Sequence, residues 1–319
     1  MPSKRFNYSA NQKLSIKRGR TDENGNLIQT IETGEIVLGN LLSNEGGEGD
    51  IYKLLSINPS EPDVTADLLV AKIYHDKGLA KSKQSKILKM LDMLYDLDDD
   101  EDFENVCWPY YAIYDGNEFV GFLMQKAIGK TLGKLFYPDF KENFPHYNRE
   151  DLVHICLKII ERFKRLHKYN VILGDINEDN FVINSRDEIY FIDTDSYQVR
   201  NERCQVERPE YKAPELIEGK ANKLTLETEG YSLCILLFKI LMLGKHPFVF
   251  RMNDDSQNTG DLSIEERIVR GMFPYSLDTN ENEKRVPPGF YLDVWNDFAI
   301  ELKQFFIDIF TRKKIYKFS

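Results

Sequence analysis

Hydrophobic and polar positions follow two different periods along the chain. Up to about residue 125, apolar residues form short strand-like runs separated by turn residues. One helix is indicated in this part by the spacing of Ile87, Leu88, Leu91 and Leu94. The pattern predicts strands over residues 36–42, 51–57, 68–74, 110–114 and 119–125, a small hairpin within 13–35 that turns at 24–26, and a helix over 79–95.

After Gly129 the apolar spacing becomes helical. Asn148 and Asp151 have the pattern of a helix N-cap, and apolar residues at helical spacing follow as far as Leu166. The pattern further predicts helices over 231–243 and 292–310, a short β pair over 181–183 and 189–192, and polar loops over 251–285. We therefore expect an α+β protein with a small β-rich lobe followed by a larger helical lobe.

Charge and composition limit the function classes. Hydrophobic residues make up 42% of the chain and charged residues 29%, an ordinary globular composition that argues against wholesale disorder. The formal net charge of −10 argues against a nucleic-acid coat. Acidic residues crowd positions 96–105, which we interpret as an exposed, solvated loop. The basic residues within 1–20 favour a solvated tail over a contact with an anionic partner.

Neither a membrane anchor nor a disulfide framework is predicted. The longest apolar stretch, 233–243, is shorter than the ~20 residues that a transmembrane helix needs, and the first residues lack the apolar core of a signal peptide. The 4 cysteines form no CxxC pair, so a zinc site is not indicated. These observations favour a reducing, cytoplasmic environment.

A glycine-rich turn is the first segment with candidate chemistry. Gly46-Gly47-Glu48-Gly49 lies between two predicted strands, where backbone N–H groups could approach phosphate oxygens. Alone, such a turn is more often an ordinary hairpin turn. A strand follows it instead of a helix, which excludes a dinucleotide-binding or P-loop motif. Gly129-Lys130-Thr131 resembles the end of a P-loop, but Met124 stands where the motif needs glycine.

Two further segments supply a lysine and hard oxygen ligands. Lys72 lies inside the apolar run 69–73, where a lysine otherwise marks an edge strand facing water. Asp175 and Asn180 form an Asp-x-x-x-x-Asn loop, and Asp193 and Asp195 follow the predicted β pair. Carboxylates and carboxamides of this kind suit Mg²⁺, which retains water ligands and bridges phosphates.

In this order, the segments resemble the protein kinase superfamily over roughly residues 36–310. Ala213-Pro214-Glu215 is similar to the motif that closes the activation segment, and Glu229 with 231–233 is similar to the start of the central helix of the large lobe. Gly244-Lys245-His246-Pro247-Phe248 matches the segment after that helix. Residues 46–49, 174–177, 192–198 and 264–275 resemble a bacterial subgroup of eukaryotic-like Ser/Thr kinases, some of which carry helix-hairpin-helix modules.

The resemblance implies a bilobal kinase fold with ATP in the cleft between the lobes. The expected parts are a basic N-terminal extension with the hairpin (1–35), the small lobe (36–124), a hinge (125–130) and the large lobe (131–319).

The resemblance also implies roles for single residues. Gly46, Gly47 and Gly49 would cover the phosphates of ATP, and Lys72, preceded by Ala71, would bind the α- and β-phosphates. Met124 would be the gatekeeper, and the backbone of Gln125, Lys126 and Ala127 would bind adenine. Asn180 and Asp193 would hold Mg²⁺, while Asp175 would accept or orient the proton of the substrate hydroxyl.

Several positions depart from the common kinase pattern. The helix after Lys72 lacks the glutamate that would pair with it, so Asp92 is the nearest candidate, and Ser85 or Lys86 takes the expected position. Asn44 stands where the glycine loop usually has its first glycine. Around Asp175, Leu173-Gly174 replaces the usual His-Arg and Asn177 replaces the usual lysine. Thr194-Asp195 replaces Phe-Gly after Asp193, and Glu207-Arg208 replaces Gly-Thr before Pro209.

We therefore expect an ATP- and Mg²⁺-dependent kinase that phosphorylates Ser/Thr hydroxyls of a protein. Two alternatives stay open, a pseudokinase that binds nucleotide and acts as a scaffold, and a kinase-fold enzyme that phosphorylates a small molecule. The retained lysine, carboxylates and carboxamide favour an enzyme, whereas the missing glutamate and the lost Gly-Thr favour the scaffold. The Ala213-Pro214-Glu215 segment favours protein substrates. The sequence indicates neither a membrane nor a nucleic-acid partner.

Overall fold

The structure is a computed structural model that describes residues 6–44, 46–58, 65–98, 100–204, 208–252, 262–275, 277 and 285–311. The chain forms two compact units. Unit 1 consists of Met1–Ile128 and Tyr190–Arg203, and unit 2 consists of Gly129–Ile189 and Cys204–Ser319. These bounds differ from the expected lobes, because the segment 190–203 joins the N-terminal unit.

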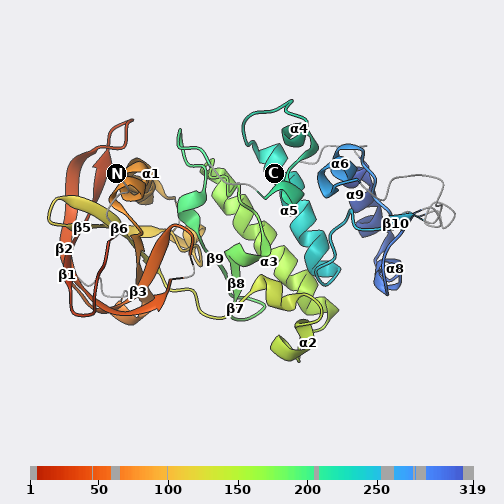
Figure 1. Cartoon of the computed structure of the whole chain (residues 1–319), viewed down its shortest axis with the longest axis horizontal. Helices are drawn as coiled ribbons and strands as arrows, with labels where there is room; N and C mark the ends of the chain where they lie inside the picture. Colours follow the sequence, from red (N-terminus) through yellow and green to blue (C-terminus); the bar gives the residue numbers. More distant parts are fainter. Residues whose placement is uncertain are drawn as a thin grey trace. The chain divides into compact units, whose positions relative to one another are not determined.

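Unit 1 is built on a closed antiparallel β-barrel, drawn in red to yellow in Figure 1. Its strands follow the order β1-β2-β3-β4-β6-β5, and β1 pairs with β5 to close it. The strands are β1 (Lys13–Thr21), β2 (Leu27–Ser43), β3 (Gly49–Asn58), β4 (Leu69–Tyr74), β5 (Pro109–Asp115) and β6 (Glu118–Gln125). The predicted strands and the predicted hairpin within 13–35 are therefore confirmed.

The barrel core follows from strand alternation. Along β4, Leu69, Ala71 and Ile73 belong to the core cluster inside the barrel, and the residues between them face the other side. Tyr8 closes one end of this cluster, and its hydroxyl donates to Asp115 Oδ2 at 3.2 Å. The hairpin that the sequence assigned to an N-terminal basic extension therefore supplies strand β1 and the first part of β2 to the barrel.

The first hairpin turns through a side-chain-stabilised loop. Asp22 Oδ1 accepts hydrogen bonds from the backbone N–H groups of Asn24 and Asn26 at 2.9 and 2.8 Å. Gly25 in this loop has a φ of +79°, and a Cβ there would lie 2.4 Å from Ser85 Oγ. Glycine is therefore required both by the backbone angle and by the close approach of helix α1.

Helix α1 (Lys77–Met93) packs on the outside of β1, β5 and β6. It begins at Asp76, whose carboxylate caps the N–H groups of Gly78 and Leu79. The short helix η1 (Ala66–Leu68) precedes β4. Two more, η2 (Leu94–Asp96) and η3 (Asp100–Phe103), follow α1.

The acidic segment 96–105 is only partly the exposed loop that was predicted. Glu101 and Glu104 are exposed, but Asp102 and Phe103 are buried. The Phe103 ring stacks on Trp108 with 4.5 Å between the ring centroids, and Trp108 is itself held by a hydrogen bond to the Met90 carbonyl. The aromatic contact therefore draws this segment against unit 1 despite its charge.

Unit 2 contains most of the helices in the described ranges, and the N-cap predicted at Asn148 and Asp151 is confirmed. Asn148 and Asp151 form a reciprocal capping box at the start of α3. The elements of unit 2 are β7 (Lys130–Thr131), η4 (Leu132–Leu135), α2 (Phe140–Asn143), α3 (Arg149–Lys168), η5 (Glu178–Asn180), β8 (Phe181–Ile183), η7 (Pro209–Tyr211), α4 (Pro214–Ile217), α5 (Leu226–Leu241), β10 (Arg251–Met252), α6 (Ile264–Val269), β11 (Arg285–Val286), α8 (Tyr291–Asn296) and α9 (Ile300–Phe310). Strand β9 (Ile189–Phe191) lies at the junction of the two units.

Helix α5 is apolar on nearly all sides because it lies in the centre of unit 2. Aromatic rings surround Phe238 on this helix at centroid distances of 5.1 to 6.4 Å, and they belong to Phe273, Tyr275, Trp295, Phe306 and Phe310. These rings come from segments that follow α5 in the sequence, so α5 organises the C-terminal part of the unit.

The single helix predicted over 292–310 is wrong. The structure has two helices, α8 and α9, separated by Asp297, Phe298 and Ala299. Asn296 and Asp297 are poor helix residues because their side chains compete for the backbone, and Phe298 packs its ring on Trp295. Of the polar stretch 251–285, residues 253–261, 276 and 278–284 lie outside the described residues, and helix α6 occupies part of the rest.

Candidate active site

Lys72 on β4 occupies a nearly closed polar site in unit 1. Its side chain is 8% exposed, and Nζ donates to Asp193 Oδ1 at 2.8 Å and to Asp195 Oδ1 at 2.6 Å. Asp195 is completely buried, and its second oxygen accepts a hydrogen bond from the Tyr74 hydroxyl at 3.0 Å. The lysine that the sequence singled out is therefore held between two carboxylates.

The electrostatics keep this site ionised. Burial by itself would lower the pKa of Lys72, but the charges of Asp195 and Asp193 outweigh it and raise the pKa above its usual value. For Asp195, burial opposes ionisation, yet the Lys72 ammonium and the Tyr74 hydroxyl hold its pKa below the usual range. The pair is therefore charged at neutral pH, with each partner compensating for the burial of the other.

Asp193 has a backbone conformation that is rare for a non-glycine residue. Its φ and ψ are 57° and 37°, in the left-handed region. The turn η6 (Thr194–Ser196) that follows is fixed by a bond from Ser196 Oγ to the Asp193 carbonyl at 2.8 Å and by one from Thr194 Oγ1 to the Cys107 carbonyl at 2.8 Å. Strained residues of this kind are found at functional sites, where the surroundings enforce them.

Lys86 on α1 holds the chain just after this turn. Its buried ammonium donates to four backbone carbonyls, those of Asp195 (3.2 Å), Ser196 (3.4 Å), Tyr197 (2.8 Å) and Arg203 (3.2 Å). The lysine thus satisfies carbonyls from both ends of the segment 195–203. Ser85 or Lys86 was expected where kinases have the glutamate, and Lys86 contacts backbone oxygens instead of Lys72.

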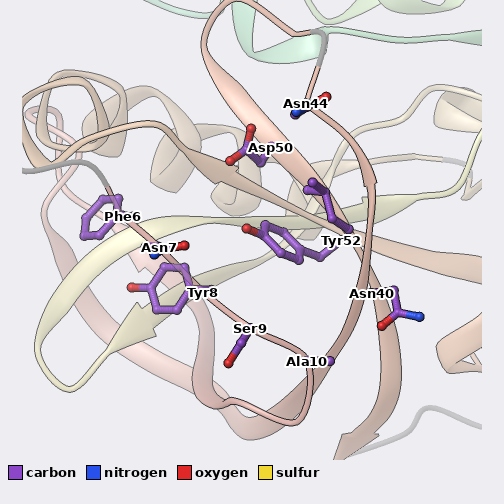
Figure 2. A pocket seen from close by; sticks show the side chains of 10 residues that line it. Phe6, Asn7, Tyr8, Ser9, Ala10, Asn40, Asn44, Asp50 and Tyr52 are labelled. Carbon is purple, nitrogen blue, oxygen red and sulfur yellow. The ribbon is translucent and has the colours of Figure 1, made fainter.

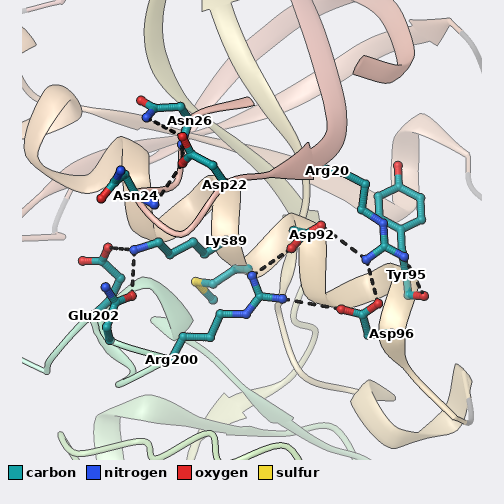
Figure 3. A network of polar contacts seen from close by, with 12 residues as sticks. Arg20, Asp22, Asn24, Asn26, Lys89, Asp92, Tyr95, Asp96, Arg200 and Glu202 are labelled. Atoms are coloured by element: carbon teal, nitrogen blue, oxygen red, sulfur yellow. Dashed lines mark hydrogen bonds and ion pairs between the residues drawn. The ribbon is translucent and has the colours of Figure 1, made fainter. Parts of the chain in front are cut away.

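Two more α1 residues bind the same segment, as Figure 3 shows. Lys89 Nζ contacts Glu202 Oε1 at 2.6 Å, and Asp92 contacts Arg200 at 2.8 Å. Asp92 also accepts from Arg20 of β1 at 3.4 Å. Asp92 was the nearest candidate for the partner of Lys72, and this expectation is wrong, because two arginines occupy its carboxylate.

The glycine turn between β2 and β3 lies beside Lys72. A Cβ at Gly49 would be 2.7 Å from the Ile73 carbonyl oxygen and 3.4 Å from Lys72 Cγ, so glycine lets β3 lie close to β4 here. A Cβ at Gly47 would meet nothing within 4 Å, whereas one at Gly46 would lie 2.9 Å from the Gly49 carbonyl oxygen. The turn thus offers open backbone at Gly47, as a phosphate-covering loop requires.

The outer side of this turn borders a cavity of about 840 Å³, shown in Figure 2. Asn44 and Asp50 from the two ends of the turn line it together with Tyr8 and Tyr52.

The residues expected around adenine lie on β4 and at the end of β6. Met124 pairs with Val70, and the Lys126 N–H beyond the strand donates to the Leu68 carbonyl at 2.8 Å, next to Gln125 and Ala127. Ala71 lies in the barrel core instead, on the face opposite to Lys72. Val70 is the neighbour that shares the face of Lys72, and the period-two alternation of a strand was the signal that could have found it.

In unit 2, Asp175 and Asn180 are brought together in one loop. Asn180 Nδ2 donates to the Asp175 carbonyl at 2.8 Å and to Asp175 Oδ2 at 3.3 Å. Asn177 is buried and caps the turn η5 by accepting from the Asp179 N–H at 2.9 Å, so it has a structural part where kinases commonly have lysine. Because Asn180 uses its amide nitrogen within the loop, Oδ1 is the atom it could offer to a cation.

The segment before Asp175 is held by a buried carboxylate from α5. Glu229 accepts the N–H groups of Leu173 at 2.5 Å and Gly174 at 3.1 Å, and it pairs with His167 at 2.5 Å. Gly174 has a φ of +74°, and a Cβ there would lie 2.6 Å from Cys204 Sγ. A side chain is therefore excluded at the position where arginine was expected.

Three further contacts within unit 2 involve the loop from Asp175 to Asn180 and the segment around Tyr211. Lys239 on α5 pairs with Glu178 at 2.9 Å and donates to the Tyr211 hydroxyl at 2.7 Å. Arg208 forms an ion pair with Asp179 at 2.7 Å. The loop is therefore tied to the residues that lead into the Ala213-Pro214-Glu215 motif.

Asp193 of unit 1 and Asn180 of unit 2 each carry an oxygen of the kind that binds a hard cation. Asp193 is 41% exposed on its side chain and meets Lys72 through one oxygen, and Asn180 offers a carboxamide oxygen. Within the described residues no group of three or more His, Cys, Asp and Glu side chains could hold a metal by itself. Mg²⁺ does not need one, because it is bound through one or two protein oxygens together with water and substrate phosphates.

Comparison with protein families identifies the chain. The family model that describes the protein kinase domain matches residues 45–313. The chain belongs to the protein kinase family. The β-rich N-terminal region, the helical C-terminal region and the order of the motifs agree with this membership.

Individual relatives are distant and include bacterial and viral kinases. Protein kinase YegI of Escherichia coli K12 is 26% identical over 269 residues, which cover 80% of this chain and 39% of the relative. The putative serine/threonine-protein kinase R436 of Acanthamoeba polyphaga mimivirus is 28% identical over 206 residues, covering 58% of this chain and 66% of that protein. The chain thus spans about two fifths of the length of the YegI proteins.

None of the helices in the described ranges is long and apolar enough to cross a bilayer.

Substituting Lys86 by methionine tests whether this lysine holds the segment 195–203. Lys86→Met should leave the buried carbonyls without their donor, lower the free energy of unfolding by about 1–3 kcal/mol, and speed amide exchange there by roughly 10-fold or more. Hydrogen–deuterium exchange and urea unfolding provide the measurements. Lys81→Met, on the exposed side of the same helix, is the matched control and should change neither. Equal exchange in both variants would contradict the assignment.

Proposed function

We propose that the chain is an ATP- and Mg²⁺-dependent protein kinase that transfers the γ-phosphoryl group to a Ser or Thr hydroxyl of a protein. The observation that carries the proposal is the charged Lys72 of a kinase-family chain, fixed by Asp193 and Asp195 at the side of the glycine turn. Such an ammonium is suited to binding phosphate oxygens. The names of the distant relatives support Ser/Thr as the acceptor type.

In unit 1, the glycine turn and Lys72 would bind the phosphates of ATP. The backbone at Gly46, Gly47 and Gly49 would lie over them, and Lys72 would contact the α- and β-phosphates. The ends of β4 and β6, with Met124, Gln125, Lys126 and Ala127, would bind adenine. Val70 shares the face of Lys72 and would take the contact that was expected of Ala71.

In unit 2, Asp175 would orient the substrate hydroxyl and accept its proton as the bond to phosphorus forms. Asn180 holds Asp175 through its amide nitrogen. Asn180 and Asp193 would ligate Mg²⁺, which when bound neutralises developing charge on the phosphates. The protein's own contribution is mainly positioning and charge compensation.

The pseudokinase alternative rested on the missing glutamate partner of Lys72 and on the loss of Gly-Thr before Pro209. Asp195 offers Lys72 a buried carboxylate at 2.6 Å, which supports the enzyme over the scaffold on the first of these points. A wild-type protein that binds Mg–ATP without transferring phosphate would favour the scaffold.

Asp193→Asn tests the metal assignment. Because the carboxylate would be the charged protein ligand of Mg²⁺, the variant should lose the Mg²⁺-dependent part of its ATP affinity together with phosphoryl transfer. Calorimetry with ATP, in Mg²⁺ and in EDTA, measures this directly. In EDTA the two proteins should bind nucleotide similarly, and an unchanged affinity in Mg²⁺ would refute the assignment.

Asp175→Asn tests the base. The variant should fold and bind Mg–ATP normally, while transfer to a generic protein substrate falls by roughly 10²–10⁴-fold, the usual range for a positioned general base. Asp179→Asn is the matched control, since Asp179 lies in the same loop but is 59% exposed and pairs with Arg208. We expect the control to keep most of its activity. Full activity in Asp175→Asn would exclude Asp175 as the base.

Activity should not require phosphorylation between Asp193 and Glu215. Lys86, Lys89 and Asp92 of α1 already bind the first part of the segment, and Gly174 offers no side chain to a phosphate. The hydroxyl residues in the described part of this segment, Thr194, Ser196, Tyr197 and Tyr211, are all buried. Phosphatase treatment and the Ser196→Ala, Tyr197→Phe double variant should therefore leave the rate within about twofold. A large loss on dephosphorylation, traced to one of these sites, would contradict this prediction.

A further inference from the structure

We propose that Asp195 is a positioning residue for Lys72, the carboxylate that orients the phosphate-binding ammonium in place of a glutamate from helix α1. The inference rests on the proposed function in one respect, that Lys72 binds the phosphates of ATP. Its structural part, the coupling of Lys72 to Asp195, can be tested without nucleotide.

The contacts of Lys72 limit its ammonium to one orientation. Asp195 Oδ1 lies 2.6 Å from Nζ and Asp193 Oδ1 lies 2.8 Å from it. The Phe122 ring centroid is 5.9 Å from Nζ on another side. Asp195 is the buried member of the two acids, with no exposed side-chain surface against 41% for Asp193. Asp193 is therefore the acid that can turn to a cation, while Asp195 stays on the lysine.

Asp195 is itself fixed on both side-chain oxygens and on its backbone. Its Oδ2 accepts from the Tyr74 hydroxyl at 3.0 Å, and its carbonyl accepts from Lys86 at 3.2 Å. The left-handed Asp193 and the turn η6 direct the chain back so that two acids only two residues apart both reach one ammonium. A carboxylate held in this way loses little conformational entropy when it positions Lys72.

Helix α1 has a charge pattern that excludes it as the source of the carboxylate. Lys83, Lys86 and Lys89 recur every three residues and contact Glu48, the carbonyls of 195–203, and Glu202. The helix thus supplies cations, and the segments packed on it supply the anions. A lysine on α1 cannot supply a carboxylate to Lys72, and Asp195, in the segment that Lys86 binds, supplies one.

Asp195→Asn is the decisive variant, because it removes the charge and keeps the shape. Lys72 would lose one of its two charge-assisted bonds, so ATP affinity should fall by about 10–100-fold, with a matching rise in KM for ATP. KM for the protein substrate should stay within about twofold. In the Lys72→Met background the same substitution should change ATP affinity by less than about threefold, because a positioning residue acts only through the lysine.

Amine modification provides a readout that needs no nucleotide. The Lys72 side chain is only 8% exposed and its amine is held by two carboxylates, so Asp195→Asn should release the amine and speed its modification by trinitrobenzenesulfonate. Peptide mapping by mass spectrometry should show an increase of roughly 10-fold or more at Lys72, because one charge-assisted hydrogen bond is lost. If Asp195→Asn does not fold, Tyr74→Phe removes the hydroxyl on Asp195 and should shift both readouts in the same direction by a smaller factor.

Asp92→Asn is the matched control. Asp92 is also a buried carboxylate of unit 1 bound to side chains of the same unit, but it contacts arginines. The control should lower stability without changing KM for ATP or the modification of Lys72.

The proposal is overturned if Lys72 modification is unchanged in Asp195→Asn, if the loss of ATP affinity persists in the Lys72→Met background, or if Asp92→Asn has the same effects. If wild-type protein fails to bind or transfer from ATP, the proposed function fails. The modification of Lys72 then still decides whether Asp195 positions it.

Discussion

The burial of one ammonium group constrains much of unit 1. Lys72 lies in a strand whose other face fills a hydrophobic core, so its charge has to be compensated on the spot. Asp195 supplies this compensation, and the turn after Asp193 brings it to Lys72. The turn leaves backbone carbonyls that need a hydrogen-bond donor. Lys86 is that donor. The segment 190–203 is thereby part of unit 1, and the acid that would ligate the metal stands next to the lysine that would bind phosphate.

Helix α1 differs from the corresponding helix of common kinases because it contacts its surroundings mainly through lysines instead of through a glutamate. Lys77, Lys83, Lys86 and Lys89 contact acids or carbonyls, and Asp92 accepts from two arginines. The helix therefore supplies cations, while Asp195 supplies the buried carboxylate that contacts Lys72.

Unit 2 also uses a buried charged group to fix the chain, here just before the loop that begins at Asp175. Glu229 is buried and collects two backbone N–H groups and His167, which fixes the chain just before Asp175. The left-handed Gly174 follows from this arrangement, since the chain passes too close to Cys204 for any side chain. The absence of an arginine at this position is therefore tied to packing, and in unit 1 the segment 195–203 is held by contacts with α1.

The sequence by itself determined what depends on neighbours along the chain. Local patterns could be recognised directly, namely the periodicity of strands and helices and the capping box at Asn148. The order of the motifs along the chain could be recognised in the same way, from the glycine turn through Lys72, Asp175 and Asn180 to Asp193. The closure of the barrel by β1 on β5, the break between α8 and α9, and the core position of Ala71 were missed. The partner of Lys72 could not be read either, because Asp195 is 123 residues away. Only the tertiary structure decides which charges meet when they are buried, since the cost of an unpaired charge depends on everything packed around it.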